Sequence, residues 1–186
     1  MPHKFLVVDV ETTGLNPAKD MLLEVCLLAV KGGEVQSRHD ILLHRPRVVG
    51  DPEALVRHAK NGLLEECADE DRTSDAETAS EALCVWLNQQ FGADDGPIVV
   101  AGKNAWKIDL PFLAADLNIR PDTWHHRVID PACKLMRWDD DAPPGLLECA
   151  RRVGIEKPKD DHRAGTGALL LFEVIKRTWD ITKGDT

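Results

Sequence analysis

The chain has 186 residues, of which 43% are hydrophobic and 30% are charged; this balance excludes an intrinsically disordered protein, and no apolar run reaches the roughly 18 to 20 residues of a membrane-spanning helix. The formal net charge is −9, and residues 51–96 alone carry twelve acids and three bases. This charge argues against a long basic groove for duplex nucleic acid, but not against a small site that meets a few phosphates through metal ions.

The predicted elements begin with three strands. Residues 5–10 form an apolar, β-branched run, residues 21–30 a second apolar run, and residues 34–44 an alternating pattern. Gly32 and Gly33, between the second and third runs, are typical of a hairpin. We therefore expect the chain to open with a small sheet.

Helices dominate the remainder of the chain. A helix over 52–62 has Asp51 as N-cap and Pro52 at its first position, and a second helix follows Ser74 or Asp75. Further along we expect a buried strand at 96–102, a helix at 110–117, a strand running into a helix capped by Asp130 at 128–136, and helices at 145–154 and 162–179. This order indicates an α/β or α+β layered domain with a mixed sheet.

Nothing in the sequence divides the chain or points outside the cytoplasm. There are no repeats or linker-like segments, the N-terminus lacks the pattern of a signal peptide, and the length fits one domain over residues 1–186. The five cysteines are an odd number, form no C-x-x-C pair, and lie mostly in apolar stretches. We expect a cytoplasmic protein with reduced, mostly buried thiols.

The strongest chemical signal is the pair Asp9 and Glu11 in VDVETTGL. Residues two apart on a strand share a face, so both carboxylates project together at the end of the first strand. Two carboxylates this close repel each other unless a cation lies between them, and Mg²⁺ or Mn²⁺ prefers such oxygen ligands. Asp109, in GKNAWKIDLPFL, opens a helix after a buried strand, and by itself it is equally well explained as an N-cap.

These two segments, with a late histidine at the head of a helix, resemble the three motifs of the DEDDh (DnaQ-like) 3′–5′ exonucleases, which include proofreading subunits of polymerases and oligoribonuclease. The resemblance covers nearly the whole chain, although the Gly-to-Asp distance in the second motif is one residue longer than usual. It implies a ribonuclease H-like α/β fold with a mixed five-stranded sheet flanked by helices. The implied activity is hydrolysis at the 3′ end of single-stranded DNA or RNA or of short oligonucleotides, and several relatives are homodimers.

The resemblance also assigns roles within the site. Asp9, Glu11 and Asp109 correspond to metal ligands, and His162 corresponds to the general base. Two divalent ions, Mg²⁺ or Mn²⁺, are implied: one lowers the pKa of the attacking water and the other stabilises the leaving 3′ oxygen. Histidine suits the role of base because its ordinary pKa, about 6.5, lies close to neutral.

The third motif departs from the family pattern. A metal-ligating Asp is expected five positions after His162, and Gly167 stands there instead. Three explanations remain open: an active-site variant that blocks turnover, a natural pseudo-enzyme that still binds nucleic-acid ends, or replacement of the ligand by water or Thr166. We expect impaired catalysis, with a non-catalytic module that binds 3′ ends or nucleotides as the alternative function.

The remaining candidates concern the substrate. By resemblance, the turn after the acids lies against the 3′-terminal nucleotide, and the residues around the second and third motifs meet phosphate and base. Trp106 is equally well explained as a core residue, and His58 is expected on a helix surface. The substrate-binding candidates are Thr12, Thr13, Gly14, Leu15, Lys103, Asn104, Trp106 and Arg163.

Overall fold

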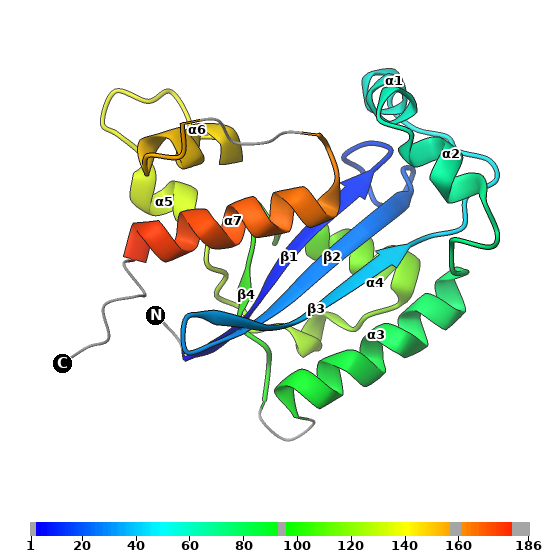
Figure 1. Ribbon diagram of the computed structural model, residues 1–186, viewed down its shortest axis with the longest axis horizontal. Helices are drawn as coiled ribbons and strands as arrows, with labels where there is room; N and C mark the ends of the chain where they lie inside the picture. Colours follow the sequence, from blue (N-terminus) through cyan, green and yellow to red (C-terminus); the bar gives the residue numbers. More distant parts are fainter. Residues whose placement is uncertain (1–2, 93–95, 157–160, 180–186) are drawn as a thin grey trace.

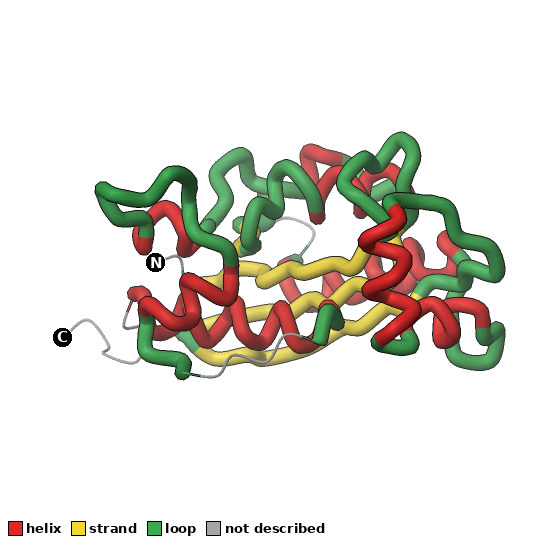
Figure 2. The backbone as a smooth tube through the Cα atoms, turned by 90° about the horizontal axis from the view of Figure 1, so that it is seen from above, coloured by secondary structure: helices red, strands yellow, loops and turns green. Residues whose placement is uncertain are grey.

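The computed structural model describes residues 3–92, 96–156 and 161–179. Its sheet contains β1 (Lys4–Thr12), β2 (Leu22–Lys31), β3 (Glu34–Leu42) and the two-residue β4 (Val100–Ala101) in the order β3-β2-β1-β4. The pairs β1–β2 and β2–β3 are antiparallel, and β1–β4 is parallel. The sheet is therefore mixed, as the sequence predicts. Its strands run side by side through the middle of the molecule (Figures 1 and 2).

Helices cover both faces of this sheet (Figure 1). On one face, Leu6 and Val8 of β1 pack in a core with α3 and α4; on the other, Phe5 and Val7 pack against α7. Both faces of β1 are buried because its side chains alternate between two apolar layers. The helices are α1 (Pro52–Lys60), α2 (Leu63–Ala68), α3 (Ala76–Phe91), α4 (Asp109–Leu117), α5 (Pro131–Leu135), α6 (Leu146–Arg152) and α7 (Ala164–Trp179), with a 3-10 turn η1 (Pro121–Thr123).

The predicted helix starts are confirmed at three positions. Asp51 accepts hydrogen bonds from Glu53 N and Ala54 N, Asp75 accepts one from Thr78 N, and Asp130 accepts one from Ala132 N. Each carboxylate satisfies backbone N–H groups that the first turn leaves without an intrahelical partner. Asp75, rather than Ser74, is thus the N-cap of α3.

The sheet differs from the prediction at its β4 edge. Within the described residues it has four strands instead of five, and β4 is shorter than the expected strand at 96–102. Two isolated parallel bridges, Ile98 with Trp124 and Ala101 with Ile129, lie where a fifth strand would pair. The strand expected at the start of 128–136 is reduced to such a bridge, because α5 begins only two residues later at Pro131.

Two further findings concern membrane-spanning helices and the burial of the cysteines. Among the residues described, no helix has the length and apolar character needed to cross a membrane. Cys26, Cys67 and Cys149 are buried, whereas Cys84 and Cys133 are exposed. Burial of most thiols is therefore confirmed.

Candidate active site

The site begins at the C-terminal end of β1. Asp9 and Glu11 lie on the face of the sheet that packs against α7, because Val7 and Phe5, two and four residues before Asp9, belong to that core. The antiparallel register places Glu24 of β2 directly opposite Glu11. Three carboxylates from two adjacent strands are therefore on one face of the sheet, where the sequence predicted two.

Asp109 approaches these acids from the first residue of α4. It is 4% exposed, and burial raises its pKa to about 7, although hydrogen bonds from its own backbone N–H and from that of Val10 oppose the rise. The bond to Val10 ties the start of α4 to β1. Asp109 is thus a ligand candidate by position, and the N-cap alternative is wrong because Ile108 occupies the N-cap position of α4.

Asp9 is the most strongly perturbed acid of the group. Burial raises its pKa well above the ordinary value, and the negative charges of Asp109, Glu11 and Glu24 raise it further. Like charges this close favour the protonated form unless a cation balances them. Such a cluster in a cleft is typical of a functional site.

His162 and Gly167 complete the site from the N-terminal end of α7. A cleft of about 380 Å³ is lined by Asp9, Glu11, Gly145, Leu146, Leu147, Asp161, His162, Arg163, Thr166, Gly167 and Leu170. The first and third motifs therefore meet in one cavity, although they are about 150 residues apart in sequence. The N-terminal end of α6 forms another wall of this cleft.

The Asp9 carboxylate lies in the space that a side chain at position 167 would occupy. A Cβ atom built on Gly167 would lie only 2.8 Å from Asp9 Cγ and closer still to Oδ2. Any side chain at position 167 therefore requires the Asp9 carboxylate to turn away. That movement is inexpensive, because the clashing atoms are the end of a side chain and not backbone.

The donor set fits a hard divalent cation in its chemistry. Asp9, Glu11 and Asp109 supply oxygen ligands, and their mutual repulsion would be relieved by positive charge. As they stand, however, no three Asp, Glu, His or Cys side chains within the described ranges gather closely enough to hold a metal ion. Asp9 points at Gly167 and Asp109 is bonded to the β1 backbone, so a bound ion would require small rotations of these carboxylates.

In the turn after β1, some of the predicted substrate-contact residues are buried and others are exposed. Thr13 is fully buried: its hydroxyl donates to Val49 O at 2.7 Å and accepts from Met21 N at 2.8 Å. Its side chain is thus unavailable to a nucleotide in this arrangement, and the contact between this turn and the substrate stays a prediction. The Thr12 hydroxyl donates to Gly14 O at 2.6 Å, whereas Leu15 is 76% exposed and available for contact.

Gly14 has a packing reason for lacking a side chain. A Cβ atom at this position would lie 2.3 Å from Asp20 Oδ2, and that carboxylate accepts a hydrogen bond from Asn16 N. The glycine therefore allows the turn to close on Asp20. This keeps the backbone of the turn, with Leu15, near the acids at the end of β1.

The candidates around the second motif lie on a turn anchored by Asp130. Lys103 Nζ donates to Asn104 Oδ1 at 2.9 Å and lies 3.6 Å from Asp130 Oδ2. Asn104 has a φ of 58°, and its N–H donates to Asp130. Trp106 is 55% exposed, which favours a contact surface over the core alternative.

Arg163 has protein partners that the sequence did not suggest. Its guanidinium donates to Glu24 through Nε and a terminal nitrogen, and to Glu66 Oε2 at 2.8 Å. These bonds raise the pKa of Arg163 and compete with the predicted phosphate contact. In this arrangement Arg163 joins α7 to β2 and α2.

His58 is buried, and the prediction of a helix-surface histidine is wrong. It is 1% exposed, its Nε2 donates to Thr12 O at 3.1 Å, and the same atom lies 3.5 Å from Glu11 Oε2. Burial lowers its pKa. Ala54, four residues earlier on α1, is also buried, and this spacing was the available signal for an inward face.

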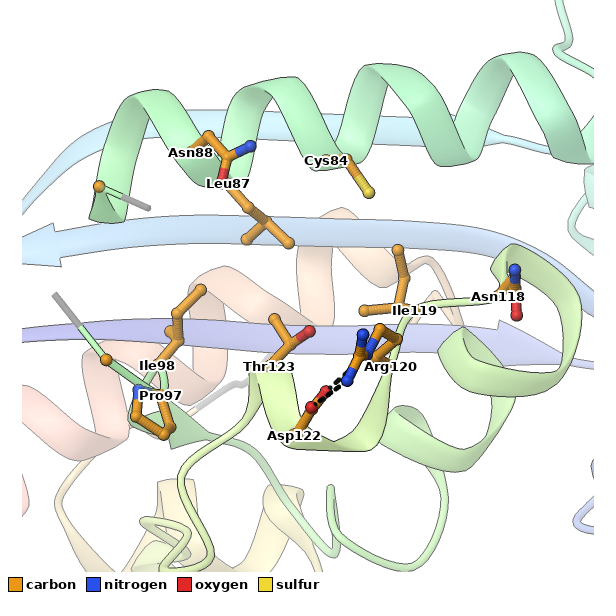
Figure 3. Close-up of a pocket in the computed structure, with 12 residues that line it drawn as sticks. Cys84, Leu87, Asn88, Pro97, Ile98, Asn118, Ile119, Arg120, Asp122 and Thr123 are labelled. Carbon is orange, nitrogen blue, oxygen red and sulfur yellow. Dashed lines mark hydrogen bonds and ion pairs between the residues drawn. The ribbon is translucent and has the colours of Figure 1, made fainter. Parts of the chain in front are cut away.

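A second cavity lies away from the acids. It has a volume of about 720 Å³ and lies between α3 and the η1 turn (Figure 3). Its charged side chains, Arg120 and Asp122, pair with each other at 2.5 Å. None of the predicted catalytic residues lines it, so the smaller cleft is the candidate active site.

The comparisons with known proteins point to one family. Residues 6–171 match the RNase_T family model, described as "Exonuclease". An oligoribonuclease of Baumannia cicadellinicola subsp. Homalodisca coagulata is 24% identical over 91% of this chain and 92% of its own length. An oligoribonuclease of Mycobacterium sp. (strain KMS) is 29% identical over 70% of this chain and 61% of its own length.

A solved structure gives the same architecture. The zinc-bound complex of E. coli ExoI with single-stranded DNA aligns with 97% of this chain and 42% of that longer chain, with a TM-score of 0.67 and 17% identity. The fold is thus the ribonuclease H-like α/β fold. The chain belongs to the exonuclease family, specifically to the DEDDh (DnaQ-like) 3′–5′ exonucleases.

Proposed function

We propose that the cleft at the head of α7 binds the 3′ end of single-stranded DNA, RNA or a short oligonucleotide in the cytoplasm and removes nucleotides with Mg²⁺ or Mn²⁺. The observation that carries this proposal is the convergence of Asp9, Glu11, His162 and Gly167 in one cleft. The oligoribonuclease relatives and the single-stranded DNA bound by ExoI support the substrate class.

The protein's own residues have distinct tasks in this proposal. Asp9, Glu11 and Asp109 hold the divalent ions, which when bound activate water and stabilise the leaving 3′ oxygen. His162, which lies just before the first residue of α7, accepts the proton of the attacking water. The backbone of the Thr12–Leu15 turn supports the terminal nucleotide, and Leu15 contacts its base.

Trp106, Lys103 and Asn104 extend this surface beyond the terminal nucleotide. An exposed tryptophan stacks on a base without selecting its identity, and such stacking contributes roughly 1–3 kcal/mol per base. Lys103 and Asn104 meet phosphate only after exchanging their present bonds with each other and with Asp130. This surface favours a short single-stranded substrate.

Gly167 predicts low activity for the chain as it stands. The family's fourth carboxylate is absent, and Asp9 occupies its space. Gly167→Asp should therefore raise the cleavage rate by at least about tenfold, equivalent to roughly 1.4 kcal/mol of barrier. The alternative, a module that binds 3′ ends without cleavage, is favoured by the same glycine.

The test uses a single-stranded oligonucleotide labelled at its 5′ end, as DNA and as RNA, with Mg²⁺ and with Mn²⁺. We expect a ladder shortening from the 3′ end, faster with Gly167→Asp and absent with Asp9→Asn. Asp122→Asn is the matched control, because it makes the same change beside the distant cavity. Binding of a nucleoside monophosphate without cleavage by any variant would replace the exonuclease proposal by the binding module.

A further inference from the structure

The turn that carries His162 is held by a side chain from a distant segment. Asn61, which follows α1, donates from Nδ2 to the carbonyl oxygen of Asp161 at 2.9 Å and to that of His162 at 2.8 Å. Its Oδ1 accepts from the N–H of Leu63, the first residue of α2, at 3.1 Å. One amide group therefore joins the corner between α1 and α2 to the turn before α7.

This turn has a conformation that requires support. His162 has a φ of 50°, in the left-handed region that residues with a Cβ atom rarely adopt. Two residues later, the N–H of Ala164 donates to Glu24 Oε2 at 2.8 Å. The backbone is thus anchored by Asn61 at Asp161 and at His162 itself, and by Glu24 at Ala164.

The same corner also contacts the acids. His58, one helical turn before Asn61, donates to Thr12 O at 3.1 Å and lies 3.5 Å from Glu11. The segment 58–61 therefore touches the end of β1 with one side chain and the turn of His162 with another. The spacing between the acids and His162 depends on this short segment.

We propose that Asn61 is a positioning residue that holds His162 in its left-handed conformation and at its working distance from Asp9 and Glu11. Asn61 does not touch the substrate; it acts through the two backbone carbonyls. The inference rests on the proposed function in that His162 is the base there.

Asn61→Asp separates this positioning role from the hydrogen bond that Asn61 accepts from Leu63 at the start of α2. The aspartate keeps the size of the side chain and the oxygen that accepts from Leu63, but it places a carboxylate oxygen against two carbonyl oxygens. A role confined to the bond with Leu63 predicts little change in cleavage, because the aspartate oxygen accepts from the N–H of Leu63 as the amide oxygen does. Asn61→Ala removes both roles, and Lys60→Ala, on the exposed adjacent residue, is the matched control.

Steady-state cleavage of the oligonucleotide is the first measurement, in both the wild-type and the Gly167→Asp backgrounds. We expect Asn61→Asp and Asn61→Ala to lower kcat by about 10- to 100-fold, as small misplacements of catalytic groups do, with KM little changed. Lys60→Ala should leave both constants unchanged. A kcat of Asn61→Asp equal to that of its background would overturn the inference and leave the proposed function standing.

The second measurement needs no turnover. The backbone ¹³Cα and Cβ chemical shifts of His162 report its φ and ψ, and Asn61→Asp should move them away from left-handed values. Unchanged shifts overturn the inference, whether or not kcat falls. If no variant cleaves, the proposed function fails, and the shifts alone decide whether Asn61 holds the turn.

Discussion

At the scale of single residues, burial and charge conflict at Asp9 and Asp109. Both carboxyls have raised pKa values because the protein surrounds them with apolar groups and other acids. Ionising such buried carboxyls without a nearby positive charge costs free energy in the folded protein. Under the proposed function, a bound cation relieves this conflict.

Asp109→Asn should raise the free energy of unfolding, and this gain should grow as the pH rises. The pKa of Asp109 in the folded protein, about 7, exceeds the ordinary value of 3.8, so its favourable contribution is complete below about pH 4 and is lost as the pH rises through about 7. In the presence of a chelator the variant should gain at least about 1 kcal/mol over the wild type near about pH 8, or about 2–4 °C in Tm. Thermal unfolding followed by circular dichroism measures the difference.

The control for this experiment is Asp122→Asn, whose carboxyl pairs with Arg120 and has a lowered pKa. It should show no gain that grows with pH. A difference between Asp109→Asn and wild type that stays constant from about pH 4 to about pH 8 would contradict the raised pKa.

At the scale of elements, α7 is anchored by side chains of other elements. Glu24 of β2 accepts from Arg163 and from the N–H of Ala164, the first residue of α7, and Glu66 of α2 accepts from the same arginine. Negative charge at a helix N-terminus is also favourable for the helix dipole. The position of His162 and Gly167 thus depends on contacts between elements.

Glu24→Gln should destabilise the protein more than Glu66→Gln. Glu24 bonds both Arg163 and the backbone of α7, and its side chain is 14% exposed against 24% for Glu66. We expect a loss of about 1–3 kcal/mol for Glu24→Gln, the range for hydrogen bonds to charged groups, and a smaller loss for Glu66→Gln. Urea unfolding of both variants provides the comparison; equal losses would mean that the bond to α7 contributes little.

The N-cap of α1 makes a separate prediction at this scale. Asp51 accepts from Glu53 N at 2.9 Å and from Ala54 N at 3.2 Å. Asp51→Ala should cost about 1 kcal/mol, whereas Asp51→Ser should retain most of the stability because serine caps almost as well. Chemical denaturation distinguishes the two variants, and an equal loss would show that the acid acts by charge alone.

At the scale of the whole molecule, the cleft lies where β1, α7 and the start of α6 meet. The protein carries a net charge of −9 and places several carboxylates on one face of its sheet. Self-repulsion of this kind opposes the compact state, and bound cations relieve it. Under the proposed function, metal binding therefore stabilises the folded protein.

Mn²⁺ should raise the Tm of the protein in proportion to the logarithm of its concentration above Kd. Binding to the folded state alone contributes about 2.7 kcal/mol at a hundredfold excess over Kd. Asp9→Asn should lose most of this shift, while Asp122→Asn should keep it. Thermal unfolding and titration calorimetry provide the measurements, and equal shifts in both variants would place the ion elsewhere.

The sequence by itself determined the mixed sheet, the caps at Asp51 and Asp130, and a cap at either Ser74 or Asp75. Of the residues that line the cleft, it singled out Asp9, Glu11, His162, Arg163, Thr166 and Gly167. These features follow from short-range rules: alternation along a strand, a carboxylate before a helix, and motifs with a fixed spacing. The departure at Gly167 was visible in the same way, because the surrounding motif specifies what belongs there.

Only the tertiary structure decided which side chains are free to act. It buried Thr13 and His58, paired Arg163 with Glu24 at a separation of 139 residues, and turned Asp9 into the space beside Gly167. It also reduced β4 to two residues flanked by isolated bridges. Periodicity specifies the face on which a residue lies, but its partners come from distant parts of the chain, and burial and hydrogen bonding with those partners determine its chemistry.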